Sequence, residues 1–331
     1  MMSKILELRG ASMAVAGVVG MLACATAMAQ SADGFPNRPV TLIVPFSAGG
    51  AVDGEARYYA NTMTKVMNQQ FVLDYKPGAG GTLASTYVAR SKPDGYTILI
   101  ANASFTVHPA VYKNLPFDTQ KDFAPVSLLS QRISVLVTGA NFRANSLGEY
   151  IEYSRANPEK VNYGTTGSGS IGHLSAAWLH SLTRTRVTFI HYKGAAPQLV
   201  DLQAGRIDVA SGNLLAQLPL IKSGKLKPLA IFTNKRSRLL PDLPSAVEAV
   251  PAFNYTNWIG MVVPSATPRP IVTKLHEGFV RMTRDPELIA AFEREGLGLA
   301  GSTPEEFAKH ILGEMALWKR VVTENNIALD E

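Results

Sequence analysis

The stretch from Val40 to Asp53 constrains the fold more than any other part of the sequence. An apolar, β-branched segment ends at Pro45, the adjacent glycines Gly49 and Gly50 follow, and apolar residues then recur at helical spacing. This pattern predicts a strand, a tight glycine loop and a helix. Such a loop points several backbone N–H groups and the positive end of the helix dipole at one place. The stretch therefore predicts a cradle for a small anion.

A second unit has the same plan, and a third strand follows it. Residues 71–73 are predicted as a strand, residues 76–81 as a glycine loop and residues 82–90 as a helix. The next strand, residues 97–100, leads to Ser104. Strands that alternate with helices predict a parallel sheet with right-handed crossovers. The loops at the carboxyl ends of these strands are then expected to face one crevice.

A second series of strands and helices begins at residue 134. The strands of this series are predicted at residues 134–137, 161–163, 187–190, 207–210 and 229–232. A proline-rich passage ends the series, and an extended segment over residues 253–263 then leads into helices only. These helices, at residues 268–283, 286–295 and 303–325, carry apolar stripes, and we expect them to pack on the first sheet.

The whole pattern predicts an α/β fold with two lobes, each a mostly parallel sheet flanked by helices. The first lobe is expected to be discontinuous, with residues 35–134 plus 252–331, and the second lobe to contain residues 135–251. Two chain crossings, near residues 134 and 252, would then form a hinge. A ligand is expected in the cleft between the lobes.

Residues 1–29 have the features of a bacterial export signal. Lys4 and Arg9 precede an apolar run, and small residues around Met28 favour cleavage before Gln30. An uncleaved membrane anchor is disfavoured because the apolar run is short of a bilayer span. The single cysteine, Cys24, lies within the signal, so we expect no disulfide. Its surroundings loosely resemble a lipoprotein cleavage site, and lipidation of Cys24 is the less favoured alternative.

Composition narrows the partners of the chain. Its 331 residues are 46% hydrophobic and 18% charged, which is typical of a globular protein with full cores. A formal net charge of +6 is compatible with an acidic ligand, but the basic residues are scattered, so nucleic acid is not an expected partner. The histidines have no metal-ligand spacing, and we expect neither a metal nor a cofactor.

The two glycine loops are the candidate anion site of the first lobe. Turn geometry alone would explain either loop, but two of them at equivalent positions favour a binding site. Neither loop has the Lys-Ser/Thr of a Walker loop or a G-x-G-x-x-G pattern, so a carboxylate is favoured over a phosphate. The candidate ligand-binding residues of this lobe are Phe46, Ser47, Ala48, Gly49, Gly50, Ala79, Gly80, Gly81 and Ser104.

A second polar loop is predicted to face the same cleft from the other lobe. Thr166, Gly167, Ser168, Gly169 and Ser170 precede a predicted helix, so their N–H and hydroxyl groups could bind a ligand or could simply cap that helix. The two interpretations have equal weight.

Two further residues, Tyr192 and Asn213, follow strands of the second lobe and are candidate lining residues. Tyr192 could present its hydroxyl and ring to the cleft, while Lys193 could be an exposed neighbour. Discrimination between ligands is expected to come from side chains such as these, because backbone donors recognise a carboxylate without identifying the rest of the molecule.

A catalytic interpretation of the second-lobe loop is weak. A serine hydrolase would use Ser168 or Ser170 with His173, but a nucleophile elbow requires G-x-S-x-G, and Ser168 stands where the first glycine belongs. No orienting acid is evident. His173 is better explained as a residue that forms hydrogen bonds at the start of a helix, and we expect no enzymatic activity.

Taken together, the motifs resemble the Bug family, the extracytoplasmic solute receptors of tripartite tricarboxylate transporters. The matching motifs occur in the family's order over nearly the whole mature chain: VPFSAGG (44–50), PGAGG (77–81), DGYTIL (94–99), LPFD (115–118), NYG (162–164), YKGAAP (192–197) and STPEEF (302–307). The sequence departs from the family at Tyr75, Lys76 and Thr82, where asparagine, arginine and asparagine are common.

The resemblance implies a periplasmic binding protein of the type II-like fold, whose lobes close on a small organic carboxylate. It implies that the two glycine loops hold one carboxylate, partly through ordered water, and that residues 166–170 hold the other end of the ligand. A monomer that delivers its ligand to a membrane permease is expected. A ligand-dependent sensor with the same fold remains the alternative.

Overall fold

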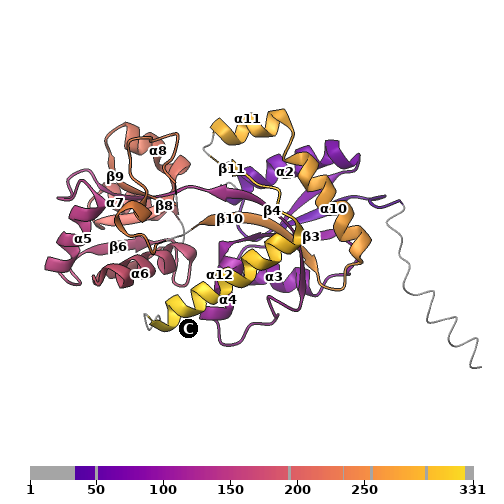
Figure 1. Cartoon of the computed structure of the whole chain (residues 1–331), viewed down its shortest axis with the longest axis horizontal. Helices are drawn as coiled ribbons and strands as arrows, with labels where there is room; N and C mark the ends of the chain where they lie inside the picture. The colour runs from indigo at the N-terminus through magenta and orange to yellow at the C-terminus, as the bar shows by residue number, and fades with distance from the viewer. Residues whose placement is uncertain are drawn as a thin grey trace, which may run out of the picture.

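The computed structural model describes residues 34–48, 51–192, 195–233, 235–253, 256–294 and 297–324. Two sheets, each with its own helices, lie side by side and give the molecule an elongated, two-lobed shape (Figure 1). The predicted α/β, two-lobed fold class is therefore confirmed. The predicted export signal, Cys24, Gly49 and Gly50 lie outside the described residues. Within the described part of the chain, no helix is long and apolar enough to cross a membrane.

The first sheet has six strands in the order β11-β4-β10-β3-β1-β2. Strand β1 pairs in parallel with β2 and with β3, whereas β10 is antiparallel to both β3 and β4, and β11 is antiparallel to β4. The strands are β1 (Val40–Val44), β2 (Phe71–Tyr75), β3 (Thr97–Asn102), β4 (Phe123–Arg132), β10 (Asn257–Pro264) and β11 (Gly298–Leu299).

Helices cover both faces of this sheet. Successive side chains of a strand point to opposite faces, and in β1 they are apolar on both. Leu42 and Val44 face a core built with α2 (Ala51–Met67), α10 (Arg269–Met282) and α11 (Pro286–Arg294). Ile43 faces the opposite core, which contains Phe105 and Phe307. The elements of that side are the short 3-10 helix η2 (Ala79–Gly81), α3 (Thr82–Ala89), α4 (Ala103–Val111) and α12 (Pro304–Glu324).

The second sheet has five strands in the order β7-β6-β8-β5-β9. Strand β6 is parallel to β7 and β8, while β5 is antiparallel to β8 and β9. Its strands are β5 (Ser134–Gly139), β6 (Asn162–Thr165), β7 (Thr188–His191), β8 (Val209–Asn213) and β9 (Leu226–Phe232). Its helices are α5 (Leu147–Ala156), α6 (Ile171–Thr183), α7 (Ala195–Gln203), α8 (Leu214–Lys222) and α9 (Ala246–Ala249).

The expectation of mostly parallel sheets is wrong in one half of each sheet. The cause is the path of the chain between the lobes. Strand β4 leaves the first sheet and continues through Ile133 into β5. Strand β5 therefore starts at the end of the second sheet that faces the first lobe, between β8 and β9. Strands β6 and β8 run toward the first lobe, whereas β5 runs away from it, so β5 is antiparallel to β8. Strand β10 returns the chain to the first sheet and opposes both of its neighbours for the same reason.

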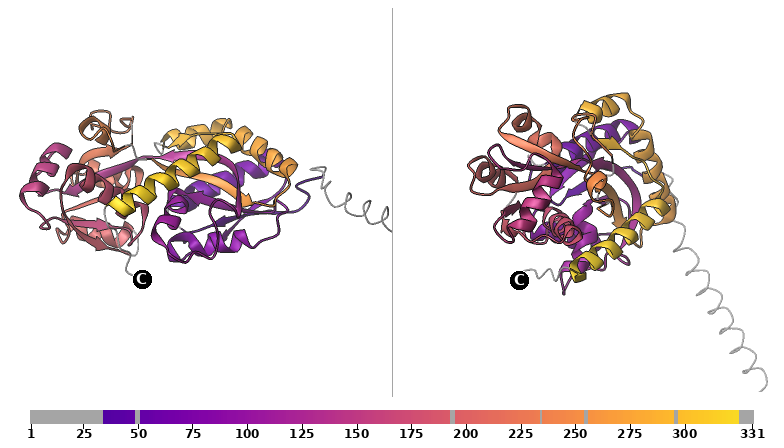
Figure 2. Two further views of the ribbon diagram at one scale, coloured as in Figure 1. Left: turned by 60° about the horizontal axis from the view of Figure 1, so that its bottom comes forward. Right: turned by 60° about the vertical axis from the view of Figure 1, so that its left-hand side comes forward.

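The C-terminal helix α12 spans both lobes (Figure 2). Phe307 and Ile311, near its start, belong to the core of the first lobe. Trp318 and Val321, near its end, belong to the main core of the second sheet, where the Trp318 ring lies 5.9 Å from that of Trp178 on α6. The helix is thus a third connection between the lobes, beside the two crossings of the chain.

Candidate functional site

The two predicted anion-binding loops of the first lobe lie next to each other. The loop after β1 places Ser47 and Ala48 at the surface and leaves Phe46 half-buried. Lys76, at the start of the second loop, donates its backbone N–H to the Val44 carbonyl at 2.9 Å. A Cβ atom on Gly81 would lie 3.3 Å from Pro45 Cβ. The parallel pairing of β1 with β2 therefore brings both loops to the same edge of the sheet.

The second glycine loop makes a sharp turn before α3. Gly80 and Gly81 adopt φ values of +63° and +102°, which glycine reaches without the strain of a Cβ atom. The Gly81 N–H donates to the Gly78 carbonyl at 2.9 Å, so the expectation that this N–H is available to a ligand is wrong. The structure places Ala79 at the start of η2. Helix α3 begins directly after this turn, at Thr82, and the start of a helix generally presents N–H groups that have no acceptor within the helix itself.

His108 of α4 supports this turn from below. Its Nε2 atom lies 3.0 Å from the Gly80 carbonyl oxygen, so Nε2–H donates. The imidazole is packed edge-on against the rings of Tyr112 and Phe117 and is 3% exposed. Burial lowers the pKa of His108 to about 4, so the ring is neutral at neutral pH. This role was missed at the sequence level, because a lone histidine outside a motif gives no signal of its partner.

Acid is expected to destabilise the protein through His108. Because its folded pKa of about 4 lies below the unfolded value near 6.5, its contribution to stability is complete above about pH 6.5 and is lost as the pH falls toward 4. The shift corresponds to about 3 kcal/mol. His108→Gln keeps a donor for Gly80 but does not titrate. We expect urea unfolding at pH 7 and pH 4 to show a loss about 2–3 kcal/mol smaller in the variant. Equal losses in both proteins would contradict this role.

Ser104 lies in the first turn of α4, where it is 7% exposed. The N-terminus of α4 directly follows β3, so Ser104 occupies the same sheet edge as the two glycine loops. Helix α4 contacts η2 on one side and α6 of the second lobe on the other. It therefore connects the glycine loops with the second half of the predicted site.

The second-lobe loop is a structured helix cap. Ser170 is the N-cap of α6, and its Oγ atom accepts from the His173 N–H at 3.2 Å. The Gly169 N–H donates to His173 Nδ1 at 3.1 Å. Ser168 is exposed, and Thr166 Oγ1 lies 3.4 Å from Ser170 Oγ. The capping interpretation is confirmed, and the expectation that the Gly169 donor is available to a ligand is wrong.

This arrangement also explains why Ser170 and His173 do not form a catalytic pair. The hydroxyl contacts the backbone of His173 rather than its ring, and Nδ1 already accepts from Gly169. Burial lowers the pKa of His173 to about 4, with a further contribution from the nearby His191 ring. Gly167 has a φ of +143°, and a Cβ atom at this position would lie 3.8 Å from the Tyr192 carbonyl oxygen. The loop therefore packs against the segment after β7.

Tyr192 lies beside the second-lobe loop, and both its backbone and its hydroxyl form hydrogen bonds within the second lobe. Its backbone N–H donates to the Thr165 carbonyl at 2.9 Å, which extends the β6–β7 pairing. Its hydroxyl donates to Asp201 of α7 at 2.7 Å. Burial and the Asp201 carboxylate raise the pKa of Tyr192 to about 12. The Tyr192 hydroxyl therefore has a partner within the second lobe, and its role as a lining residue stays a prediction.

Asn213 is the N-cap of α8. Its Oδ1 atom accepts from the Leu215 N–H at 2.8 Å, and the residue is half-buried at the inner end of β8. Capping thus uses its carbonyl oxygen. Asn213 stays a predicted lining residue through its amide nitrogen.

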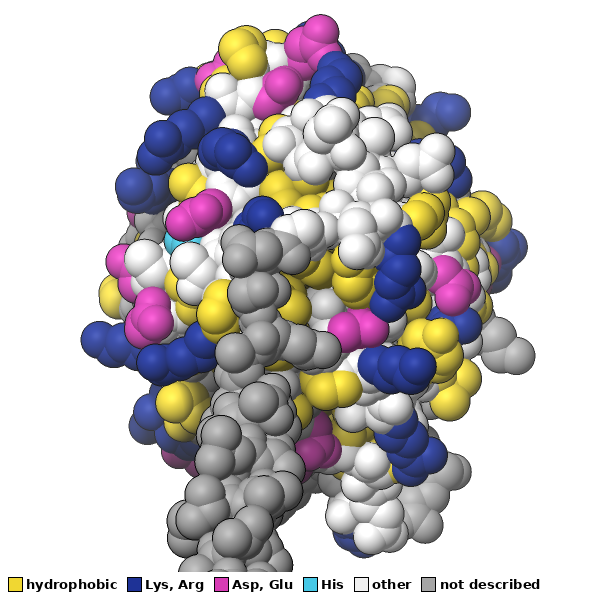
Figure 3. Space-filling model, turned by 90° about the vertical axis from the view of Figure 1, so that its right-hand side faces the viewer, with side chains coloured by type: hydrophobic (Ala, Val, Ile, Leu, Met, Phe, Trp, Pro, Cys, Tyr) yellow, Lys and Arg dark blue, Asp and Glu magenta, His cyan; other side chains and the backbone are white. Residues whose placement is uncertain are grey.

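The two halves of the site meet at α4. Ile171, which follows Ser170, packs against the first-lobe core that contains Phe105 and Phe307. The start of α6 and the second glycine loop are therefore both in contact with α4. On the face of the first lobe drawn in Figure 3, Lys and Arg side chains are interspersed with acidic and apolar ones.

The fold and the sequence are similar to those of known solute receptors. Residues 55–327 match the TctC family model, the tripartite tricarboxylate transporter family receptor. The protein BugT of Bordetella pertussis is 31% identical over 331 residues, with 99% of each chain covered.

Two similar proteins have solved structures that contain a bound dicarboxylate. The structure of Rpa4515 of R. palustris with adipate has a TM-score of 0.81 and 33% identity, covering 89% of this chain and 99% of the other. The structure of MatC from Rhodopseudomonas palustris with bound malate has a TM-score of 0.78 and 31% identity, covering 87% of this chain and 100% of the other.

Proposed function

We propose that this chain, which belongs to the TctC family of tripartite tricarboxylate transporter receptors, binds a small dicarboxylate between its two lobes and delivers it to a membrane permease. The observation that supports the proposal is that the turn after β1, described as far as Ala48, lies beside the second glycine loop, and that α4 contacts both η2 and α6. We assign residues 35–134 plus 252–331 to the first lobe and residues 135–251 to the second.

Recognition would rest on backbone donors and helix termini. The first turn of α3 and the turn that follows β1 supply N–H groups, and the positive ends of α2, α3 and α4 favour a negative charge at this edge. Closure of the lobes removes water from the cleft, which strengthens each N–H to carboxylate hydrogen bond. The second carboxylate would then lie near Thr166 and Ser168, on the opposite lobe.

The proposed ligand class rests on the ligands of two related proteins and on the presence of one donor region on each lobe. The related proteins of R. palustris bind adipate and malate, linear dicarboxylates with four to six carbons. Two separate donor regions, one on each lobe, suit a molecule with a carboxylate at either end. We propose that this chain acts in the periplasm without catalysing a reaction, as a monomer whose partner is the permease.

Calorimetry with the purified mature chain tests the proposal. Adipate and malate are expected to bind. Benzoate is expected to bind more weakly because it has a single carboxylate, and glutamate because it adds an ammonium group. Absence of heat with every dicarboxylate would contradict the proposal. Equal weak binding of all the acids would also contradict it, because it would show no defined site.

A bulky side chain at Ser168 is expected to block the cleft. Ser168 is exposed and makes no side-chain hydrogen bond within the described part of the chain, so Ser168→Trp places an indole in the cleft without burying a polar group. We expect dicarboxylate affinity to fall at least tenfold, about 1.4 kcal/mol, with the thermal midpoint unchanged.

The matched control is Ser265→Trp, an exposed serine just after β10 at the outer end of the first lobe. This variant should bind as the parent does. If the two variants bind equally well, Ser168 does not face the ligand.

A further inference from the structure

A pocket lies between the lobes, on the side of the molecule where the edge strands β9 and β11 run. It has a volume of about 510 Å³, within the range of small-molecule sites. One wall consists of residues 236–239, which follow β9, and the other of the end of α11 and of β11. Strands β9 and β11 are edge strands, whereas β1 and β2, with the glycine loops, lie at the other end of the first sheet. The lining shares no residue with the predicted carboxylate site.

The interior of this pocket is mainly apolar. The side chains that form it come from both lobes and from the crossing between them: Ile133, Leu239, Ile289, Phe292, Leu297 and Leu299. Ile289 is 36% exposed although it is a large apolar residue, so the pocket leaves apolar surface in contact with water. Covering such surface is favourable at about 25 cal/mol per Å².

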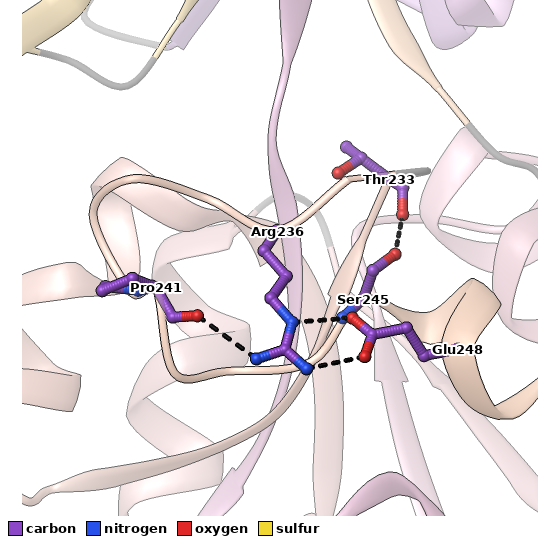
Figure 4. Close-up of polar contacts among 5 residues, drawn as sticks. All are labelled: Thr233, Arg236, Pro241, Ser245 and Glu248. Atoms are coloured by element: carbon purple, nitrogen blue, oxygen red, sulfur yellow. Dashed lines mark hydrogen bonds and ion pairs between the residues drawn. The ribbon is translucent and has the colours of Figure 1, made fainter.

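The wall from the second lobe is held in a fixed conformation (Figure 4). Arg236 donates to both carboxylate oxygens of Glu248, at 2.8 and 2.6 Å, and Glu248 also accepts from the Ser245 N–H at 2.9 Å. The hydrogen bonds from Arg236 hold the pKa of Glu248 at about 2. A third Arg236 contact, 3.4 Å to the Pro241 carbonyl, ties the loop to itself. The charge of Arg236 is therefore committed to this loop.

Arg238 supplies the charge that is not committed. It is exposed, lines the pocket, and within the described residues has neither an ion pair nor a hydrogen bond. Glu293 stands on the wall of the first lobe and would oppose a second negative charge there. An apolar interior with one available guanidinium suits a ligand with an apolar body and a single carboxylate.

We propose that this pocket is a second binding site, which takes an amphipathic monocarboxylate with its apolar body against Ile133 and Ile289 and its carboxylate on Arg238. The proposal goes beyond the carboxylate cleft and does not depend on it. Ile133 joins β4 to β5, so a ligand here contacts both lobes and the crossing between them. Its occupancy would therefore favour the lobe arrangement that keeps both walls in contact with the ligand.

Octanoate is the probe for the experiment, and octylammonium, with the same apolar chain and the opposite charge, is its control. We expect octanoate to bind the mature chain in calorimetry and octylammonium to bind at least about tenfold more weakly. Arg238→Gln should weaken octanoate binding at least about fivefold, because it removes the charge-assisted hydrogen bond. Ile289→Trp, which fills the pocket from the exposed side of α11, should weaken it at least as much.

Arg143→Gln is the matched control, since Arg143 is an exposed arginine beyond the outer end of β5 and lies outside the lining of the pocket. It should bind octanoate as the parent does. Octanoate binding that survives Arg238→Gln and Ile289→Trp but is lost in Ser168→Trp would place the probe in the cleft and overturn the proposal. Equal binding of octylammonium would overturn the assigned charge. Failure of the dicarboxylate panel alone would affect only the proposed function.

Discussion

Arg132→Met is expected to lower the free energy of unfolding by about 3–5 kcal/mol, because it leaves the Glu55 carboxylate buried without its cation. Arg132 ends β4 next to the crossing between the lobes, and its Nε donates to Glu55 of α2 at 2.5 Å. The side chains are 6% and 3% exposed. Glu55 also accepts from the hydroxyls of Tyr59 and Ser130, at 3.0 and 2.5 Å. Urea unfolding at pH 7 measures the loss.

Two comparisons separate the buried charge from a general effect of substitution. Glu55→Gln in the Arg132→Met background removes the unpaired charge but keeps an acceptor for Tyr59 and Ser130, so it should recover more than half of the loss. Lys65→Met breaks the exposed pair with Glu287 and should cost at most about 1 kcal/mol. If Arg132→Met costs no more than Lys65→Met, the pair does not fix α2 to the crossing strand.

Trp318→Ala is the second large effect, with an expected cost of about 3–5 kcal/mol. Trp318 is 0% exposed and fills the junction between α12 and the second lobe, where it meets Trp178. Its Nε1–H donates to Glu314 at 3.0 Å, and burial already raises the pKa of that carboxyl. Truncation would open a cavity and remove a donor from a buried acid. Chemical denaturation monitored by circular dichroism measures the change.

The same helix offers a matched control. Leu312 is 50% exposed, so Leu312→Ala makes a similar truncation on α12 without a cavity and should cost less than about 0.5 kcal/mol. Trp318→Phe keeps an aromatic ring against Trp178 but loses the indole donor, and it should fall between the two. A Trp318→Ala protein as stable as Leu312→Ala would show that the end of α12 contributes nothing to the second lobe.

The sequence predicts correctly those elements whose signal lies in residues close together in the chain. The strand, glycine loop and helix from Val40 onward are present as β1 and α2, apart from the two glycines outside the described residues. The Ser-x-x-Glu spacing from Ser146 to Glu149 is typical of a capping box, and Ser146 is the N-cap of α5, with its side chain accepting from the Glu149 N–H. Such signals depend only on residues a few positions apart, so one sequence is enough to detect them.

Elements whose identity depends on distant partners were missed. Strand β4 was not predicted, because Pro125 and the polar Ser127 and Ser130 interrupt its apolar pattern. Those hydroxyls are satisfied by remote groups: Ser127 donates to the Ser302 carbonyl and Ser130 to Glu55. Helix α4 and the two-residue strand β11 were missed as well.

The candidate site shows the same limit. Its loops were located correctly in the chain, but sequence could not show which of their polar groups bind within the protein. Gly81, Gly169 and Tyr192 each donate to a partner that only the fold brings near. The ligand contacts of the remaining candidates stay predictions. Hydrogen bonds within a loop compete with those to a ligand, and single-sequence patterns do not rank the two.

The place of β10 in the first sheet has a consequence for biosynthesis. A ribosome releases β3 and β4 early, but the position between them is filled only when residues 257–264 emerge, after the whole second sheet. Until then β4 lacks both of its neighbours in the sheet, because β11 emerges later still, and pairing over so long a separation is slow. The first sheet is therefore completed late in synthesis, and a chain that stops before residue 257 is expected to leave β4 without a strand partner.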